Sequence, residues 1–131
     1  MLKVFPAIFK REEIGYSVSI PDLSGCFSEG DTLDEAIIMI KDAAGLYLYG
    51  LEEDREEIPK ASIPIDIELE EDECIIMIDI DMLAYRQKHD SKSIKKTLTI
   101  PSWLNYVAEE NDINFSQTLQ LAIKSQLGIR V

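Results

Sequence analysis

The sequence has 131 residues and is 46% hydrophobic, so it can form one ordinary domain or two small ones and is far from a disordered composition. No apolar run approaches the roughly 18 residues of a transmembrane helix, and the N-terminus lacks the features of a signal peptide, so we expect a cytoplasmic protein. The net charge of −12 is unevenly distributed: residues 1–90 hold 22 acidic and 8 basic side chains, and residues 91–131 hold 3 acidic and 5 basic ones. The acidic first part repels nucleic acid, and its charge either favours a basic partner or merely maintains solubility.

Three strands are predicted at the N-terminus. Apolar residues alternate over residues 2–9, and Pro6 favours a position near a sheet edge because proline cannot donate to a strand ladder. Residues 14–20 alternate in the same way, and the Lys-Arg-Glu-Glu sequence between the two runs makes a hairpin connection. After a Pro-Asp-Leu-Ser-Gly turn, residues 26–28 leave room for only a brief third strand.

A capped helix follows these strands. Thr32 is a candidate N-cap and Glu35 completes a capping box, so a helix is predicted from here to about Gly50–Glu53. Its main apolar face repeats with helical spacing and comprises Leu33, Ala36, Ile37, Ile40, Ala44, Tyr47, Leu48 and Leu51. A second stripe, about 120° away, comprises Met39, Ala43, Leu46 and Gly50. The second stripe is either covered by another part of the chain or is an exposed contact surface for a partner.

The segment after the helix is less regular. Apolar residues alternate from Ile63 to Leu69, which is compatible with a strand or with an extended loop. Alternation over residues 76–81 predicts a strand, and the polar residues 82–93 predict half a turn of helix that runs into a linker. The two cysteines show no disulfide or metal-binding spacing, so we expect Cys26 and Cys74 to be buried or half-buried free thiols.

The last segment predicts a strand and two helices. A short strand is predicted over residues 95–100. It ends at Pro101, a residue suited to the first turn of a helix. That helix has an apolar stripe of Leu104, Val107 and Ala108. Asn114 is a natural N-cap for a second helix, whose apolar residues are Leu119, Ala122, Ile123 and Leu127. A strand and two helices in about 34 residues cannot enclose a core, so this segment needs a second copy of itself.

The string KKTLTIPSWL, followed by AEENDINFSQTLQLAIKSQL, resembles the ribbon-helix-helix family of transcriptional repressors. In that family, strands of two chains pair into an antiparallel ribbon that lies in the major groove of DNA. The resemblance implies that alternate strand residues, Lys95, Thr97 and Thr99, point toward DNA, and that Leu98 and Ile100 lie in the dimer core. Lys96 is expected to add a contact that acts partly through phosphate.

The resemblance also implies a second contact with DNA. Ribbon-helix-helix proteins use the N-terminus of their second helix as a phosphate clamp, because free amides and the helix dipole attract an anion. In this sequence the clamp corresponds to Asn114, Phe115 and Ser116. A helical hairpin with an incidental strand is the structural alternative.

The string IPDLSGCFSEGDTLDEAIIMIKDAAGLYL resembles the signature of HicB-type antitoxins, and the order of the remaining segments extends the resemblance over essentially the whole chain. It implies an α+β fold in which a partial ribonuclease-H-like β-β-β-α-β domain at residues 1–85 binds a toxin. Residues 86–93 are a linker, and residues 94–131 are a ribbon-helix-helix (β-α-α) dimerisation domain. Some members carry a helix-turn-helix instead, but the strand before Pro101 favours the ribbon. The implied partner is a HicA-type toxin, a small basic protein that cleaves messenger RNA with a histidine.

The residues give little support to an enzyme. Metal-dependent nucleases need carboxylates that converge on divalent ions. Asp22, Asp42, Asp79 and Asp81 are available, but their spacing indicates no particular site. His89, the single histidine, falls in the linker, and neither a phosphate-binding loop nor a nucleophile elbow is present. We therefore expect no catalytic residue, no metal and no cofactor.

The sequence thus predicts an antitoxin and repressor that acts by binding alone. The acidic first part blocks a HicA-type toxin, with Met39, Ala43 and Leu46 as the expected contacts. The C-terminal domain forms a homodimer that holds operator DNA, and further assembly to a tetramer stays open. The alternative is a stand-alone ribbon-helix-helix repressor whose N-terminal domain senses a small ligand or only oligomerises. No membrane partner is expected.

Overall fold

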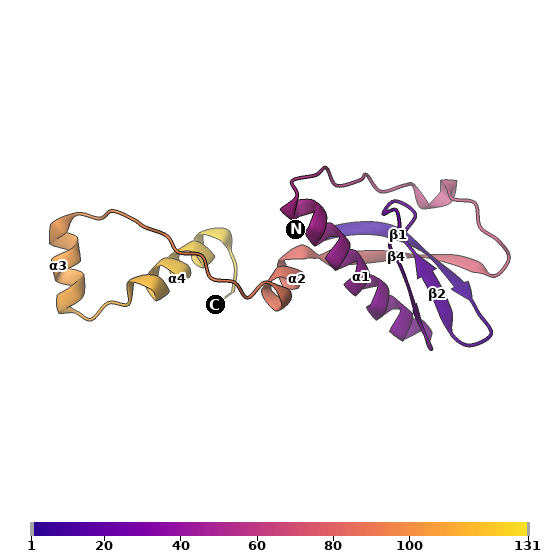
Figure 1. The fold of residues 1–131 in the computed structure, drawn as a ribbon, viewed down its shortest axis with the longest axis horizontal. Coiled ribbons are helices and arrows are strands. Elements are labelled where there is room, and N and C mark those ends of the chain that lie inside the picture. Colours follow the sequence, from indigo (N-terminus) through magenta and orange to yellow (C-terminus); the bar gives the residue numbers. More distant parts are fainter. Residues whose placement is uncertain (1, 131) are drawn as a thin grey trace. The chain divides into compact units, whose positions relative to one another are not determined.

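The computed structural model describes residues 2–130 and divides into an N-terminal unit, residues 1–92, and a C-terminal unit, residues 93–131. The N-terminal unit is built on a four-stranded antiparallel sheet (Figure 1). Its strands are β1 (Leu2–Arg11), β2 (Tyr16–Ser19), β3 (Phe27–Gly30) and β4 (Glu73–Asp81), in the order β3-β2-β1-β4. The four strands predicted in this unit are confirmed, and the order of strands and helix, β-β-β-α-β, is also the predicted one.

Pro6 lies in an internal strand and yet at a locally unpaired edge. β1 runs between β2 and β4, but its pairing with β2 begins only at Ile8, which faces Ser19. At Pro6 the strand therefore has one partner, Met77 of β4. The missing N–H of proline is tolerated because no strand lies on the other side of β1 at this position.

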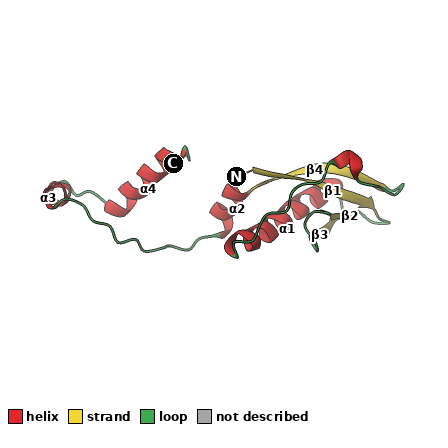
Figure 2. Cartoon of the chain, turned by 90° about the horizontal axis from the view of Figure 1, so that it is seen from above, coloured by secondary structure: helices red, strands yellow, loops and turns green. Residues whose placement is uncertain are grey.

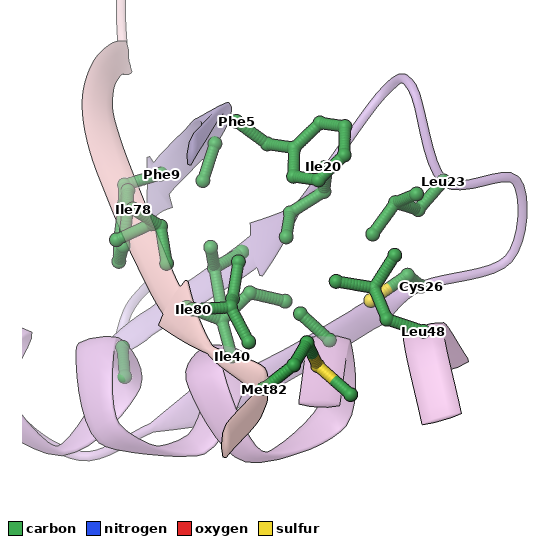
Figure 3. Packing of buried hydrophobic residues seen from close by; sticks show 14 residues of the cluster. Phe5, Phe9, Ile20, Leu23, Cys26, Ile40, Leu48, Ile78, Ile80 and Met82 are labelled. Atoms are coloured by element: carbon green, nitrogen blue, oxygen red, sulfur yellow. The ribbon is translucent and has the colours of Figure 1, made fainter. Parts of the chain in front are cut away.

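Helix α1 (Leu33–Glu53) packs on one face of the sheet and closes the core (Figure 2). The predicted cap is confirmed: the Oγ1 atom of Thr32 accepts the N–H of Glu35 at 3.1 Å, and the Glu35 carboxylate accepts the N–H of Asp31 at 3.1 Å. The main apolar face also packs as predicted. Figure 3 shows Ile40 and Leu48 of α1 among the buried side chains of the sheet.

The segment between α1 and β4 is a loop and not a strand. Residues 54–72 contain one short 3-10 turn, η1 (Pro64–Asp66), which answers the question left open by their alternating pattern. Asp22, in the turn after β2, anchors this loop because its two carboxylate oxygens accept the N–H and the hydroxyl of Ser62. Ile63 and Ile65 stay exposed.

Helix α2 (Met82–His89) is longer than the half-turn predicted from the sequence. The Asp81 carboxylate caps it by accepting the N–H of Ala84 at 3.1 Å. The Arg86 guanidinium lies 3.2 Å from the Glu52 carboxylate and 3.0 Å from that of Glu53, and it stacks on the ring of Tyr49. These contacts hold α2 against the end of α1, and they could not be read from the polar sequence of α2 itself.

The two cysteines differ in exposure. Cys26 is buried as expected, and burial raises the pKa of its thiol. Cys74 is exposed, which contradicts the expectation of a buried or half-buried thiol. Cys74 shares the face of the buried Ile78 and Ile80, but it is the second residue of β4, an edge strand, and therefore lies at the margin of that face.

The C-terminal unit contains α3 (Ser102–Glu110) and α4 (Phe115–Leu127). Asn114 caps α4 and Gly128 ends it in the left-handed conformation, with φ 70°, as predicted. The strand predicted over residues 95–100 is absent from the described residues 2–130, in which this segment is a loop that pairs with none of the four strands. A β-strand needs a hydrogen-bonded neighbour, and the predicted neighbour is the same strand of a second chain.

Candidate functional site

The second stripe of α1 is a surface that the rest of the N-terminal unit leaves open. Met39 is 43% exposed and Leu46 is 64% exposed. Ala43 is half-buried and packs against the core, and Gly50 is half-buried. Of the two possibilities left by the sequence, coverage by another part of this unit is therefore excluded for Met39 and Leu46. An apolar strip of this kind on an acidic domain is typical of a protein contact surface.

A hollow adjoins the second stripe at β3. It encloses about 580 Å³, and Met39 contributes to its wall together with residues of β1, β2, β3 and β4. Phe27 and Glu29 of β3 are among the lining residues. We name this depression the β3 hollow.

Phe27 and Glu29 were not singled out in the sequence. The available signal was strand alternation: Cys26 and Gly30 are buried, and Phe27 and Glu29 are exposed. The predicted third strand, residues 26–28, was too short for this alternation to indicate an exposed face. Only the folded sheet shows that the exposed Phe27 side chain lies beside apolar residues of other elements.

The expected DNA-contacting residues lie in the C-terminal unit and are all exposed. Lys95, Lys96, Thr97 and Thr99 fall in the extended segment before Pro101, where they are neighbours along the chain and not part of a ladder. They are therefore available for contacts, but the single chain does not arrange them into a ribbon.

The expected phosphate clamp is at the start of α4. The Oδ1 atom of Asn114 accepts the N–H of Gln117 at 3.0 Å, and the Ser116 hydroxyl accepts from Gln120 at 3.2 Å. The amides of Phe115 and Ser116 belong to the first turn, whose N–H groups have no acceptor within a helix. This helix end can accept an anion, and its first turn carries no acidic side chain that would repel one.

The C-terminal unit has no core of its own. None of the residues of α3 and α4 is buried. The exposed large apolar side chains include both predicted core positions of the strand and several of the helices, namely Leu98, Ile100, Leu104, Val107, Ile123 and Leu127. A unit that leaves these residues in water buries too little apolar surface to be stable alone.

The carboxylates considered for catalysis serve the structure instead. Asp22 binds Ser62, Asp81 caps α2, and Asp42 lies 3.8 Å from the ring of His89. Asp79 pairs with Lys41 at 3.0 Å, and the hydrogen bond from Lys41 lowers the pKa of the Asp79 carboxyl below its usual range. Among residues 2–130 no three His, Cys, Asp or Glu side chains converge as metal ligands.

The described helices are also all too short or too polar to cross a bilayer.

Comparisons with known proteins agree on one family. The sequence model of HicB-like antitoxins of bacterial toxin-antitoxin systems matches residues 5–122. The chain is 34% identical over 105 residues to a 14.9 kDa protein from the rep-hol intergenic region of Haemophilus phage HP1, which covers 77% of this chain and 75% of that protein.

Two solved structures are similar to this chain in fold. A chain of a toxin-antitoxin complex from Streptococcus pneumoniae is similar with a TM-score of 0.64 and 28% identity, over 96% of this chain and 99% of that one. The antitoxin HicB of Burkholderia pseudomallei has a similar fold, with a TM-score of 0.55 and 21% identity, over 92% of this chain and 96% of that one. The first similarity extends over both units of this chain.

Proposed function

The chain belongs to the HicB-like antitoxin family, and from this membership we propose that it neutralises a small basic toxin of the HicA type and represses its own operon. The family consists of binding proteins and not of enzymes, so both activities are acts of binding. The observation that carries the proposal is the similarity, over 96% of the chain, to a chain of a toxin-antitoxin complex. The cytoplasmic location expected from the sequence is part of the proposal, because messenger RNA and operator DNA are both found there.

The toxin-binding role falls to the N-terminal unit. Its 22 acidic and 8 basic residues up to position 90 complement a basic partner and speed association with it. The exposed second stripe, with Met39, Ala43 and Leu46, offers the apolar contacts that affinity requires. We extend the domain predicted at residues 1–85 to Asp90, because Arg86 ties α2 to α1 and the Tyr49 hydroxyl donates to the Asp90 carboxylate.

The DNA-binding role falls to a dimer of the C-terminal unit. The segment with Lys95, Lys96, Thr97 and Thr99 is an exposed loop, which leaves it free to form a strand that pairs with its copy in the major groove. Pairing of the two strands supplies the missing ladder and brings Leu98 and Ile100 together with the apolar faces of α3 and α4. The start of α4, with Asn114, Phe115 and Ser116, then binds a phosphate of the DNA backbone.

A growth assay tests the antitoxin role. The reading frame beside this one should encode a basic protein of fewer than about 100 residues with a histidine, and its expression alone should arrest growth. Co-expression of the full chain should restore growth and the two proteins should co-purify. If the chain binds operator DNA but neither binds that product nor rescues growth, the protein is a stand-alone repressor.

A further inference from the structure

The register of the sheet defines an outer face that α1 does not cover. Phe5, Phe9 and Val18 are buried beneath α1, so their neighbours along each strand point to the opposite side. On that side, directly paired residues form rows across the sheet. One row joins Ile8, Ser19 and Phe27, and the next joins Lys10, Ser17 and Glu29.

The β3 hollow runs along these two rows, whose residues Ile8, Ser17, Ser19, Phe27 and Glu29 line it. Val18 and Met39, from the α1 side, also contribute to its wall. Ile8, Phe27 and Met39 give it apolar walls, and Glu29 and Glu73 contribute carboxylates. The Phe27 side chain is 72% exposed, although a residue of this size is normally buried on folding. An apolar bed with acidic residues beside it is complementary to a side chain that is apolar along its stem and cationic at its tip.

The Glu29 carboxylate of the hollow is available for such a partner, whereas the Glu73 carboxylate accepts the N–H of Glu70 at 2.9 Å. No Lys or Arg of residues 2–130 lies within 4.0 Å of the Glu29 carboxylate. Lys10, which pairs with Glu73 across β1 and β4, has its Nζ 3.9 Å from Glu70 instead. β3 is also an edge strand, so a partner can approach it without displacing another strand.

We propose that the β3 hollow receives a lysine- or arginine-bearing segment of the basic toxin, with the aliphatic stem on Phe27 and Met39 and the charge at Glu29. The proposal rests on the antitoxin function and extends its interface: Met39 belongs to both the second stripe and the hollow, so the contact surface continues from α1 onto β3. A second copy of this chain is a poorer occupant. Two such acidic units would bring carboxylates against carboxylates, whereas a basic partner neutralises them.

The test measures toxin binding by the full-length chain, with the toxin's histidine replaced so that the toxin can be purified. Phe27→Ala removes the aromatic contact and should raise the Kd about 30-fold, as expected for an anchor at an interface. Glu29→Lys should slow association and weaken its dependence on salt. Two matched controls are Ile65→Ala, an exposed apolar residue outside the hollow, and Glu57→Lys, an exposed carboxylate in the loop after α1. Both controls should bind within about twofold of the wild type, as peripheral positions do.

Each outcome decides the matter. If the wild-type chain binds the toxin and neither Phe27→Ala nor Glu29→Lys binds it more weakly than its control, the hollow is not a toxin site. The antitoxin function is then still supported. Failure of the wild-type chain to bind the toxin overturns both. A change of oligomeric state in light scattering, with toxin affinity unaltered, assigns the hollow to a second copy and also overturns the proposal. Glu29 is exposed and without an ion pair, so Glu29→Lys remains informative even if Phe27→Ala unfolds.

Discussion

Gly45 and Gly50 of α1 lie less than two turns apart in the same helix and have opposite surroundings. A Cβ atom added at Gly45 would clash with the Tyr85 ring of α2, whereas a Cβ atom at Gly50 would have no atom within 4 Å. Glycine at position 45 is therefore required for close packing of α2 on α1. Glycine at position 50 only lowers the helix propensity.

The two alanine variants should consequently differ in sign. Gly50→Ala should stabilise the N-terminal unit by about 0.5–1 kcal/mol. Gly45→Ala gains the same helix propensity, but its Cβ forces Tyr85 and α2 away at a cost of about 1–3 kcal/mol. The cost exceeds the gain, so the free energy of unfolding of the N-terminal unit should fall. Urea unfolding followed by circular dichroism measures both. Equal stability of the two variants would show that α2 does not pack on α1 as described.

At the scale of elements, the capped helix was the most predictable part of the fold. Thr32 and Glu35 define its start through local hydrogen bonds, and the period of its main apolar face matches the buried residues. α2 was the least predictable, because Arg86 finds its partners Glu52 and Glu53 more than 30 residues away. Local patterns predict elements that local contacts stabilise, and they miss elements stabilised by packing.

The second stripe of α1 yields a prediction about toxin binding. Met39→Glu or Leu46→Glu places a charge on a surface that the toxin would have to desolvate, so either change should abolish or strongly weaken binding. Both side chains are exposed in the free protein, so the circular dichroism spectrum should stay unaltered. Ile65→Glu serves as the control, since Ile65 is an exposed apolar residue of the loop before β4. Full toxin binding by both folded variants would place the interface elsewhere.

The extended segment before α3 yields a prediction about DNA. Thr97→Ala should relax the preference for particular base pairs and cost about 1–3 kcal/mol at the operator. Lys96→Ala should weaken binding to all sequences more evenly and reduce the dependence of affinity on salt. Fluorescence anisotropy with operator and scrambled DNA separates the two effects. Unchanged operator affinity after both Thr97→Ala and Thr99→Ala would contradict the ribbon.

Across the whole molecule, the family resemblance implied a domain at residues 1–85, a linker at 86–93 and a second domain at 94–131, and the charge balance changes sign near residue 90. The structure divides between residues 92 and 93. The ribbon could be expected from resemblance to a family, but a single chain cannot form it, since half of every hydrogen bond in the ladder belongs to the partner. The β3 hollow could not be predicted either, because its lining residues come from four strands and a helix that are distant in sequence.

The exposed apolar residues of the C-terminal unit predict that the full chain is at least a dimer at micromolar concentration. Leu98, Ile100 and Ile123 have no cover within the C-terminal unit. Ile100→Asp should therefore shift the chain toward monomer and unfold α3 and α4, because it places a charge in the dimer core. Light scattering gives the mass, and the fluorescence of Trp103, the single tryptophan, reports on α3. A wild-type monomer with both helices intact would contradict the dimer.

The most direct measurement compares residues 1–90 with the full chain in calorimetric titrations against the toxin and against operator DNA. The shorter chain retains the sheet, α1 and α2, including the contacts of Arg86 and Asp90. We predict that it stays folded and binds the toxin, with an affinity below that of the dimer because it lacks paired sites, and that it no longer binds operator DNA. A folded 1–90 chain that does not bind a toxin which the full chain binds would contradict the assignment of toxin binding to the acidic N-terminal unit.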